Sequence, residues 1–560
     1  MDAEKTHDAV DLSHHLSDLA KARKMSPLKG LQKYMGREHM IAFAGGLPSP
    51  DYFPFAAVGG DALVADSFAL APPPPPSPSP SPSPLAWLWR LLGSAPRAER
   101  TARIAVPKAP RAGDGGLNLA TALQYGPATG MPALQAFVQA FSARVFRPAH
   151  AGFATLVHTG NTDGWSRCVM TLCNPGDTII AEEWTYPSAL ASAGPVGVGV
   201  LPVAMDGEGM RADSLRELLE GWDVSRGRRP HVMYTVPVGQ NPCGATMQLA
   251  RKKQIYDICV EFDVVIVEDD PYFFLQVDEY VPKADRKAAP EASAQDEVSH
   301  FIDSLAPSYL RVDYQGRVIR LDTFSKTIAP GVRLGWFTCN PMFAERLERQ
   351  GETSTQSPCG LGQALVTKLL STWKYEGYIR WLRGLRMQYQ LRRDLFVDLL
   401  AEEFELVQAP GTRAQGAWHG RAVYTAYPKA PAPARGRALL SFGEKAGGGA
   451  VRKPLFSFVP PAAGMFVWVK LHFAGLARRR GGGDEDDGEE TTQEMRLWTA
   501  LAEAGVLTAP GWFFAADQED APTDPDVEGH MRMSFSSAEP EDMRKGVAIF
   551  AKTLKEFFRE

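Results

Sequence analysis

Apolar residues in this chain gather in short continuous runs, and longer stretches with an apolar stripe on one side separate them. Such runs, rich in β-branched residues, are typical of strands buried on both faces of a sheet. They predict strands at residues 178–181, 232–236, 264–267 and 317–321. The separating stretches predict helices at 162–173, 212–222 and 249–261, and a hairpin-like piece at 196–204. Because strands joined by helices run in one direction, the pattern predicts an α/β fold whose mostly parallel central sheet has helices on both faces.

A second, smaller unit is predicted after the α/β part. A long helix rich in Leu, Arg and Tyr is expected at 377–403, and apolar segments follow at 461–469 and from residue 506 onward. We therefore divide the chain into an N-terminal arm at 1–43, a large domain at 44–376 and a small α+β domain at 377–560.

Four segments interrupt this pattern and are predicted to be disordered insertions. They are rich in Pro, Gly or charged residues and lie at 66–118, 281–304, 409–453 and 475–493. The first contains a run of alternating Ser and Pro within 72–84, a composition that favours polyproline II and does not build a core. Of the 560 residues, roughly 420 then remain for the folded part. That length fits one two-domain enzyme better than three or four separate domains.

Charge and composition argue against several classes of protein. The net charge is −5 and the pI about 6.2, so there is no basic field to hold nucleic acid. The six cysteines form no C-x-x-C pair and the eleven histidines show no metal spacing, so neither a disulfide framework nor a metal site is predicted. The N-terminus lacks a signal pattern, and no apolar stretch reaches the ~18 residues of a membrane helix. We therefore expect a cytoplasmic protein with no nucleic-acid or membrane partner.

Polar side chains cluster just after the predicted strands. In an open α/β sheet, ligands bind at the carboxyl ends of the strands, so these residues are the first candidates for chemistry. The hydroxyls and cations around Lys326, with the free N–H groups at the start of the helix 162–173, would suit a phosphate. The candidates are Asn161, Thr162, Asn241, Asp269, Tyr272, Thr323, Ser325, Lys326 and Arg333.

Pyridoxal 5′-phosphate makes five demands on a protein: a lysine for its aldehyde, an acid for its ring nitrogen, a donor for its ring hydroxyl, an aromatic face and a phosphate cup. This sequence offers a candidate for each. The chain also contains the motifs Ala44-Gly45-Gly46-Leu47-Pro48, Gly160-Asn161-Thr162, Gly239-Gln240-Asn241-Pro242, the stretch from Val267 to Tyr272, the stretch from Gly316 to Gly335, and Arg532-Met533-Ser534. In order and spacing they resemble the fold-type I aminotransferases, most closely the fungal aromatic amino acid aminotransferases related to kynurenine and 2-aminoadipate aminotransferases.

The resemblance implies a role for each cofactor candidate. Lys326 would bind the cofactor aldehyde covalently and, once freed by substrate, carry the proton between Cα and C4′. Asp269 would pair with the ring nitrogen, because the family places this acid three residues before the tyrosine that here is Tyr272. Asn241 and Tyr272 would hydrogen-bond the ring oxygen, and Tyr186 would stack on the ring. The phosphate would be held by Asn161, Thr162, Thr323, Ser325 and Arg333, and by Tyr125 of a neighbouring subunit, which implies a homodimer.

The resemblance also implies the reaction. Arg532 would clamp the α-carboxylate of the substrate, with Asn241 beside it, and Gly46 would line the substrate side. Lys29 stands where related aminoadipate and kynurenine enzymes tend to carry arginine, which favours an aromatic donor. The implied function is transfer of the amino group of Phe, Tyr or Trp to a 2-oxo acid such as 2-oxoglutarate. Transamination of 2-aminoadipate or kynurenine is the alternative, and a lyase, a decarboxylase or a transcription regulator with the same cofactor is less favoured.

Overall fold

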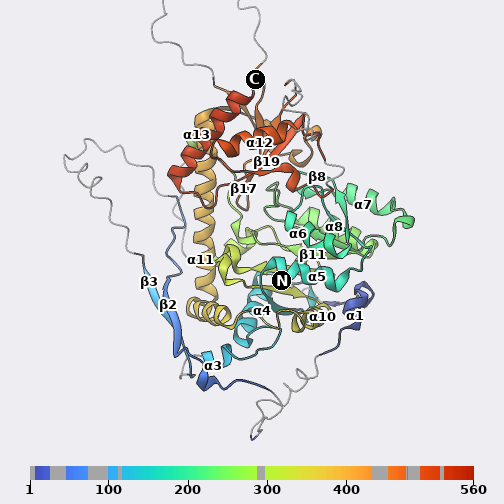
Figure 1. The fold of residues 1–560 in the computed structure, drawn as a ribbon, viewed down its shortest axis with the longest axis vertical. Helices are drawn as coiled ribbons and strands as arrows, with labels where there is room; N and C mark the ends of the chain where they lie inside the picture. The colour runs from blue at the N-terminus through green and yellow to red at the C-terminus, as the bar shows by residue number, and fades with distance from the viewer. Residues whose placement is uncertain are drawn as a thin grey trace, which may run out of the picture.

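The computed structural model describes residues 7–25, 39, 46–72, 99–110, 116–286, 297–429, 452–474, 476, 492–517 and 522–559. Two sheets organise this part of the chain (Figure 1). Most residues predicted to bind the cofactor lie at or just after the ends of strands of the larger sheet, and the smaller sheet is formed by the C-terminal part of the chain. No helix of the described residues combines the length and the apolar character needed to cross a membrane.

The larger sheet contains seven strands of the described chain, in the order β5-β13-β12-β11-β10-β6-β7. All neighbouring pairs are parallel except the two that involve β13, so the predicted, mostly parallel sheet is confirmed. The expected hairpin at 196–204 is wrong: this segment is β7, which follows a helical crossover and pairs parallel with β6. The strands are β5 (Ala154–His158), β6 (Thr178–Glu182), β7 (Gly199–Val203), β10 (Val232–Thr235), β11 (Val265–Asp269), β12 (Val318–Thr323) and β13 (Gly335–Cys339).

Helices cover both faces of this sheet, as the apolar strands require. Side chains alternate along β11, and Val265 and Val267 pack into one core with Trp165 of α5, whereas Ile266 packs into another with Ile255 of α8. The helices on the first face are α1 (Asp18–Ala22), α5 (Asn161–Leu172), α6 (Pro187–Ala193) and α10 (Pro341–Glu352). Those on the second are α4 (Pro132–Phe146), α7 (Ala212–Glu220) and α8 (Leu249–Glu261).

The smaller sheet is antiparallel, and its described strands follow the order β14-β15-β16-β17-β19-β18. The predicted helix at 377–403 is the second half of α11 (Gly360–Glu403), which runs along one side of the molecule from the larger sheet to α13 (Figure 1). It is kinked at Lys374, where φ is 57°. The expected domain boundary at 376/377 therefore falls inside α11 and stays a prediction. The other elements here are β14 (Phe404–Pro410), β15 (Ala422–Pro428), β16 (Phe456–Phe458), β17 (Phe466–His472), β18 (Ala509–Pro510), β19 (Glu528–Ser534), α12 (Gln493–Glu503) and α13 (Pro540–Phe557).

Three of the segments predicted to be loops contain regular structure. In 66–118, β3 (Thr101–Pro107) pairs with β2 (Ala57–Leu63) in a ribbon beside α11 (Figure 1). In 281–304 lies α9 (Glu297–Asp303), and in 409–453 lies β15. The prediction is wrong for these residues because each short element is flanked by low-complexity sequence that dominates the local composition. Most of the Ser-Pro run and most of 475–493 lie outside the described residues.

Several small elements complete the described chain. The N-terminal segment pairs with the body of the molecule through β1 and β4, and its Leu12, Leu16 and Ala20 join the core of the first face. These elements are β1 (His7–Asp8), β4 (His150–Ala151), α3 (Leu119–Ala122), β8 (Met205–Asp206) and β9 (Gly209–Met210).

Candidate active site

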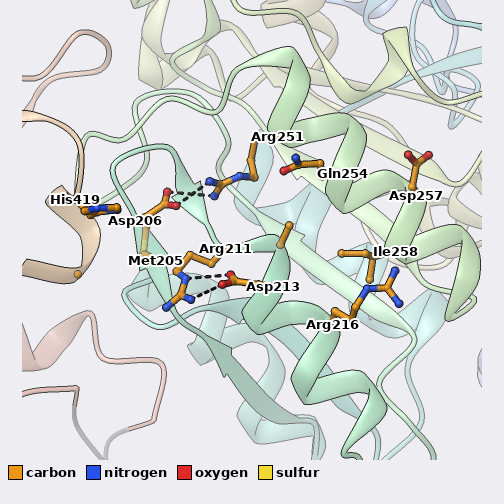
Figure 2. Close-up of a pocket in the computed structure, with 12 residues that line it drawn as sticks. Met205, Asp206, Arg211, Asp213, Arg216, Arg251, Gln254, Asp257, Ile258 and His419 are labelled. Carbon is orange, nitrogen blue, oxygen red and sulfur yellow. Dashed lines mark hydrogen bonds and ion pairs between the residues drawn. The ribbon is translucent and has the colours of Figure 1, made fainter. Parts of the chain in front are cut away.

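One large cavity of the described residues contains none of the predicted site residues. It has a volume of about 670 Å³ and lies between α7, α8 and the loop around His419 (Figure 2). Its three arginines are already paired: Arg251 donates to Asp206 at 2.7 Å, Arg211 Nε to Asp213 at 3.0 Å and Arg216 Nη2 to Glu261 at 2.6 Å. With these charges neutralised, the described lining of this cavity offers no free cation for an anionic ligand, and we assign it no role.

A second cavity, of about 330 Å³, lies at the carboxyl ends of β10, β11 and β12, where the smaller sheet meets the larger one. This is where ligands bind in an open α/β sheet. Most of the predicted site residues line it, although they come from segments up to 371 positions apart. The lining residues are Asn161, Thr162, Tyr186, Tyr234, Val236, Asn241, Asp269, Pro271, Tyr272, Thr323, Ser325, Lys326, Pro330, Arg333, Phe466 and Arg532.

Lys326 is positioned by the short 3-10 turn Phe324–Lys326 that follows β12. Thr323 caps this turn, because its Oγ1 accepts from the backbone N–H of Ser325 at 3.0 Å. Within the described chain, the Lys326 amine makes no hydrogen bond or ion pair. Burial, aided by the charges of Arg532 and Arg333, lowers the pKa of Lys326. Lys326 therefore loses its proton more readily than an exposed lysine does, and the neutral amine can act as nucleophile or base.

The three consecutive acids at the end of β11, residues 268–270, face two different sides of the strand. Asp269 faces the cavity. Glu268 and Asp270 both turn to the buried guanidinium of Arg320, which approaches Glu268 at 3.2 Å and Asp270 at 2.9 Å. This alternation follows from the pleat of the strand. It places in the cavity the acid that the family spacing had selected.

Two neighbours hold the Asp269 carboxylate. The Tyr234 hydroxyl donates to its Oδ2 at 2.7 Å and the Asn161 amide to its Oδ1 at 2.6 Å. Burial raises the pKa of Asp269, and these two donors oppose that effect. Sequence reasoning missed Tyr234, and it assigned Asn161 to the phosphate, whereas the Asn161 side chain contacts Asp269. The available signal was a tyrosine inside the apolar strand β10, because a buried hydroxyl needs a hydrogen-bond partner.

A concave set of donors lies at the start of α5. Gly160 has a φ of 104°, and a Cβ at this position would overlap the guanidinium of Arg333, so the close approach requires glycine. Arg333 also donates to the Ser325 hydroxyl at 3.3 Å, and Thr323 donates to the same hydroxyl at 2.9 Å. With the free N–H groups of the first turn of α5, these groups form a cup for an anion.

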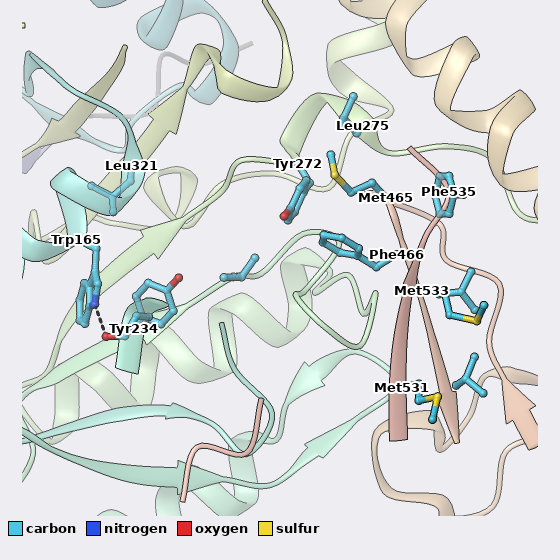
Figure 3. Close-up of a cluster of buried hydrophobic side chains, with 14 of the residues drawn as sticks. Trp165, Tyr234, Tyr272, Leu275, Leu321, Met465, Phe466, Met531, Met533 and Phe535 are labelled. Atoms are coloured by element: carbon cyan, nitrogen blue, oxygen red, sulfur yellow. Dashed lines mark hydrogen bonds between the residues drawn. The ribbon is translucent and has the colours of Figure 1, made fainter. Parts of the chain in front are cut away.

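Arg532 enters the cavity from β19 of the smaller sheet. Its Nη1 donates to Asn241 Oδ1 at 2.7 Å, and its guanidinium lies 4.0 Å from the ring centroid of Phe466 and 4.7 Å from that of Phe514. Burial lowers the pKa of Arg532. Phe466 meets Tyr272 edge to face, with the ring centroids 5.9 Å apart (Figure 3). This side of the cavity therefore combines one cation with aromatic walls.

Three predicted residues do not join this cavity. Tyr125 lies between α3 and α4 and is 65% exposed, and Gly46 is also exposed. Lys29 lies outside the described residues. The roles expected for these three residues stay predictions.

Comparison with known proteins identifies the family. A family model described as aminotransferase class I and II matches residues 102–415, more than half of the chain. The chain belongs to the class I and II aminotransferases.

Relatives match this aminotransferase over nearly its full length. An aromatic amino acid aminotransferase of Schizosaccharomyces pombe is 32% identical over 555 residues, with 98% of both chains covered. An L-tyrosine:2-oxoglutarate aminotransferase of Tapinella panuoides is 30% identical, over 98% of this chain and 96% of the relative. The crystal structure of aminotransferase Aro8 from Candida albicans has a TM-score of 0.76 at 31% identity, covering 99% of this chain and 100% of the other.

The cofactor of this aminotransferase is pyridoxal 5′-phosphate, and the cavity fits it. The donor set contains an unpaired lysine amine, a buried carboxylate, a tyrosine hydroxyl and an anion cup, which match the aldehyde, ring nitrogen, ring oxygen and phosphate. Asn161 Oδ1 is buried and has no hydrogen-bond partner among the described residues. The cavity therefore still has polar groups to satisfy, as a binding site for a polar cofactor should.

Tyr234→Phe is expected to lower kcat of the aminotransferase about 10- to 100-fold, because a hydrogen bond to a charged group contributes about 1.5–3 kcal/mol. The Tyr234 bond lowers the pKa of Asp269, so its loss should raise that pKa and move the acid limb of the kcat profile to higher pH. Steady-state kinetics across pH measure both effects. Tyr256→Phe is the matched control, because Tyr256 donates to the buried Asp313 at 2.9 Å away from the cavity. An equal shift of the acid limb in both variants would show that Tyr234 has no special role.

Proposed function

We propose that this aminotransferase transfers the amino group of an aromatic amino acid to a 2-oxo acid such as 2-oxoglutarate. The observation that carries the proposal is the single cavity that holds Lys326, Asp269 and Arg532. The names of the relatives, an aromatic amino acid aminotransferase and an L-tyrosine:2-oxoglutarate aminotransferase, support the choice of substrates.

Lys326 is the proposed proton carrier. The cofactor, when bound, supplies the electron sink that makes the Cα–H bond of an amino acid acidic. The Lys326 amine, whose pKa is lowered, is suited to remove this proton from Cα and to return it at C4′ of the cofactor. Asp269, held by Tyr234 and Asn161, places a negative charge where the ring nitrogen is expected, and Tyr272 offers a hydroxyl to the ring oxygen.

Arg532 is the proposed anchor of the substrate. Its planar guanidinium matches a carboxylate, and the rings of Phe466 and Phe514 restrict its orientation. An anchored α-carboxylate is retained in the product, which favours transamination over decarboxylation. The rings of Phe466, Tyr186 and Tyr272, which line the same cavity, provide apolar surface for an aromatic side chain.

We also propose a homodimer as the working form, and the cytoplasm as its location. The exposed Tyr125 ring is 65% accessible in one chain and, by resemblance to the family, would reach the phosphate in a second copy. Sedimentation of the cofactor-loaded enzyme tests the dimer, and a monomer mass at working concentration would contradict it.

The test of the function is a panel of amino donors against 2-oxoglutarate. We expect kcat/KM for Phe, Tyr and Trp to exceed that for 2-aminoadipate and kynurenine at least about tenfold, a difference of about 1.4 kcal/mol in transition-state binding. Parallel double-reciprocal plots are expected, because the amino group is stored on the enzyme between two half-reactions. If 2-aminoadipate or kynurenine is the best donor, the aromatic assignment is wrong and transamination stands. If no donor in the panel is transaminated, the reaction itself is wrongly assigned.

A further inference from the structure

Two consecutive histidines of the N-terminal segment meet an aspartate from the body of the molecule. His14 and His15 belong to the 3-10 turn Ser13–His15, and Asp263 follows the end of α8. His14 Nε2 lies 2.6 Å from Asp263 Oδ2, and His15 Nε2 lies 3.0 Å from Asp263 Oδ1. Within the described chain, this is the group of three potential ligands whose atoms all lie within 4.8 Å of one another. It lies outside the cavity around Lys326.

We propose that His14, His15 and Asp263 bind a divalent transition-metal ion such as Zn²⁺, which fastens the N-terminal segment to the body of the enzyme. Two imidazole nitrogens and one carboxylate oxygen are a donor set that Zn²⁺ and similar ions prefer. The side chain of His14 is 53% exposed and that of Asp263 46% exposed, so solvent supplies the remaining position. Metal ions can enter from the same side.

A buried contact between His15 and a further histidine, His231, supports this proposal. His15 Nδ1 lies 3.0 Å from His231 Nδ1, and both side chains are buried. His231 Nε2 is buried without a hydrogen-bond partner, and the nearest carboxylate, Asp177 Oδ2, is 3.6 Å away. One nitrogen of each ring must therefore donate and the other accept, which links the tautomers of the two histidines.

When His15 and His231 are both neutral, their protons can be arranged in two ways, and only one of them directs an N–H of His231 to Asp177. If His15 Nε2 donates to Asp263, then His15 Nδ1 must accept from His231, and the lone pair of His231 Nε2 faces a carboxylate. If His15 Nε2 instead gives its lone pair to a metal, His15 Nδ1 donates to His231, and His231 Nε2–H points to Asp177. A ligand histidine whose other nitrogen donates to a further group is the usual arrangement in metal sites.

Asp263 is held in place by a separate contact. Arg317 Nη1 donates to its Oδ1 at 2.8 Å, which leaves Oδ2 as the ligand atom. Metal–ligand distances of about 2.0–2.1 Å in a tetrahedral site separate ligand atoms by roughly 3.3 Å. The 2.6 Å contact between His14 and Asp263 would therefore widen on binding. The exposed His14 ring can make this movement without disturbing the core.

Cobalt substitution provides the test, using the cofactor-loaded enzyme without an affinity tag and after treatment with a chelator. We expect one Co²⁺ per chain with visible absorption, displacement of Co²⁺ by Zn²⁺, and a higher melting temperature with Zn²⁺. His14→Ala should weaken binding at least about 100-fold while the metal-free melting temperature stays unchanged. His231→Gln should weaken it about 10- to 100-fold, the usual effect of a group behind the ligands. His7→Ala is the matched control, since His7 belongs to the same segment and is not one of the three proposed ligands, and it should bind as the original chain does.

The proposal is overturned if the original chain binds no stoichiometric metal, or if His14→Ala binds as tightly as the original. Asp263→Asn gives a second, independent check, because it removes the ligand charge and keeps the shape of the side chain. Transamination is measured alongside, and its failure in the original chain would count against the proposed function without bearing on metal binding.

Discussion

Lys326→Ala is expected to reduce transamination by about 10⁴-fold or more, because it removes the amine proposed to hold the cofactor and to carry the proton. The visible absorption of the covalently bound cofactor should be lost, while the melting temperature changes little, since the Lys326 amine makes no hydrogen bond or ion pair within the described chain. Turnover with phenylalanine and 2-oxoglutarate, together with the absorption spectrum of the purified variant, measures the effect.

Lys253→Ala is the control for this substitution. Lys253 is an exposed residue of α8, and alanine is well tolerated in a helix. Its turnover should stay within about twofold of the original. Unchanged absorption and turnover in Lys326→Ala would sink the assignment of the lysine.

Asp269→Asn is expected to lower kcat about 10²- to 10⁴-fold. Loss of one charge from a buried ion pair costs about 3–5 kcal/mol, and each 1.36 kcal/mol corresponds to a factor of ten in rate. The shape of the side chain is kept, so the fold should tolerate the change. Single-turnover kinetics with a saturating amino donor separate this chemical effect from weaker binding of substrate.

Asp270→Asn is the matched comparison, one residue further along the same strand. Asp270 accepts from the buried Arg320 at 2.9 Å and does not line the cavity. We expect its loss to reduce the free energy of unfolding by about 1–3 kcal/mol, with a smaller effect on kcat than Asp269→Asn. Denaturant unfolding should therefore show the larger loss of stability in Asp270→Asn, whereas kcat should fall more in Asp269→Asn. If Asp270→Asn lost more activity than Asp269→Asn, the choice of Asp269 would be wrong.

The larger sheet and most of the site could be predicted from the sequence because their signals are local. The run at 264–267 is continuous and apolar, and its acids follow directly, so both the strand and the position of Asp269 at its end can be recognised. The motif around Lys326 likewise carries its threonine, serine and arginine within a few residues. In each case, one short segment contains both the structural signal and the chemistry.

The contacts that could not be predicted join residues distant in the sequence. Tyr234 meets Asp269 because β10 and β11 are neighbours, with Tyr234 paired to Val267 in the register. His15 meets Asp263 only because the N-terminal segment folds back onto the end of α8, a separation of 248 positions. Spacing rules compare residues within one segment, so they give no indication of such pairs. The strand β3 was missed for the opposite reason, since its signal is local but weaker than that of the proline-rich sequence beside it.

The hydrogen bond between Arg532 and Asn241 has a consequence for the cost of binding substrate. It joins β19 of the smaller sheet to the loop after β10 of the larger one, through the two groups proposed to recognise the substrate. A substrate carboxylate that arrives at Arg532 would share or replace an acceptor that is already present, rather than order a free side chain. Immobilising such a side chain otherwise costs about 0.5–1.5 kcal/mol. Part of the entropy loss of substrate recognition is thus incurred when the chain folds, before the substrate arrives.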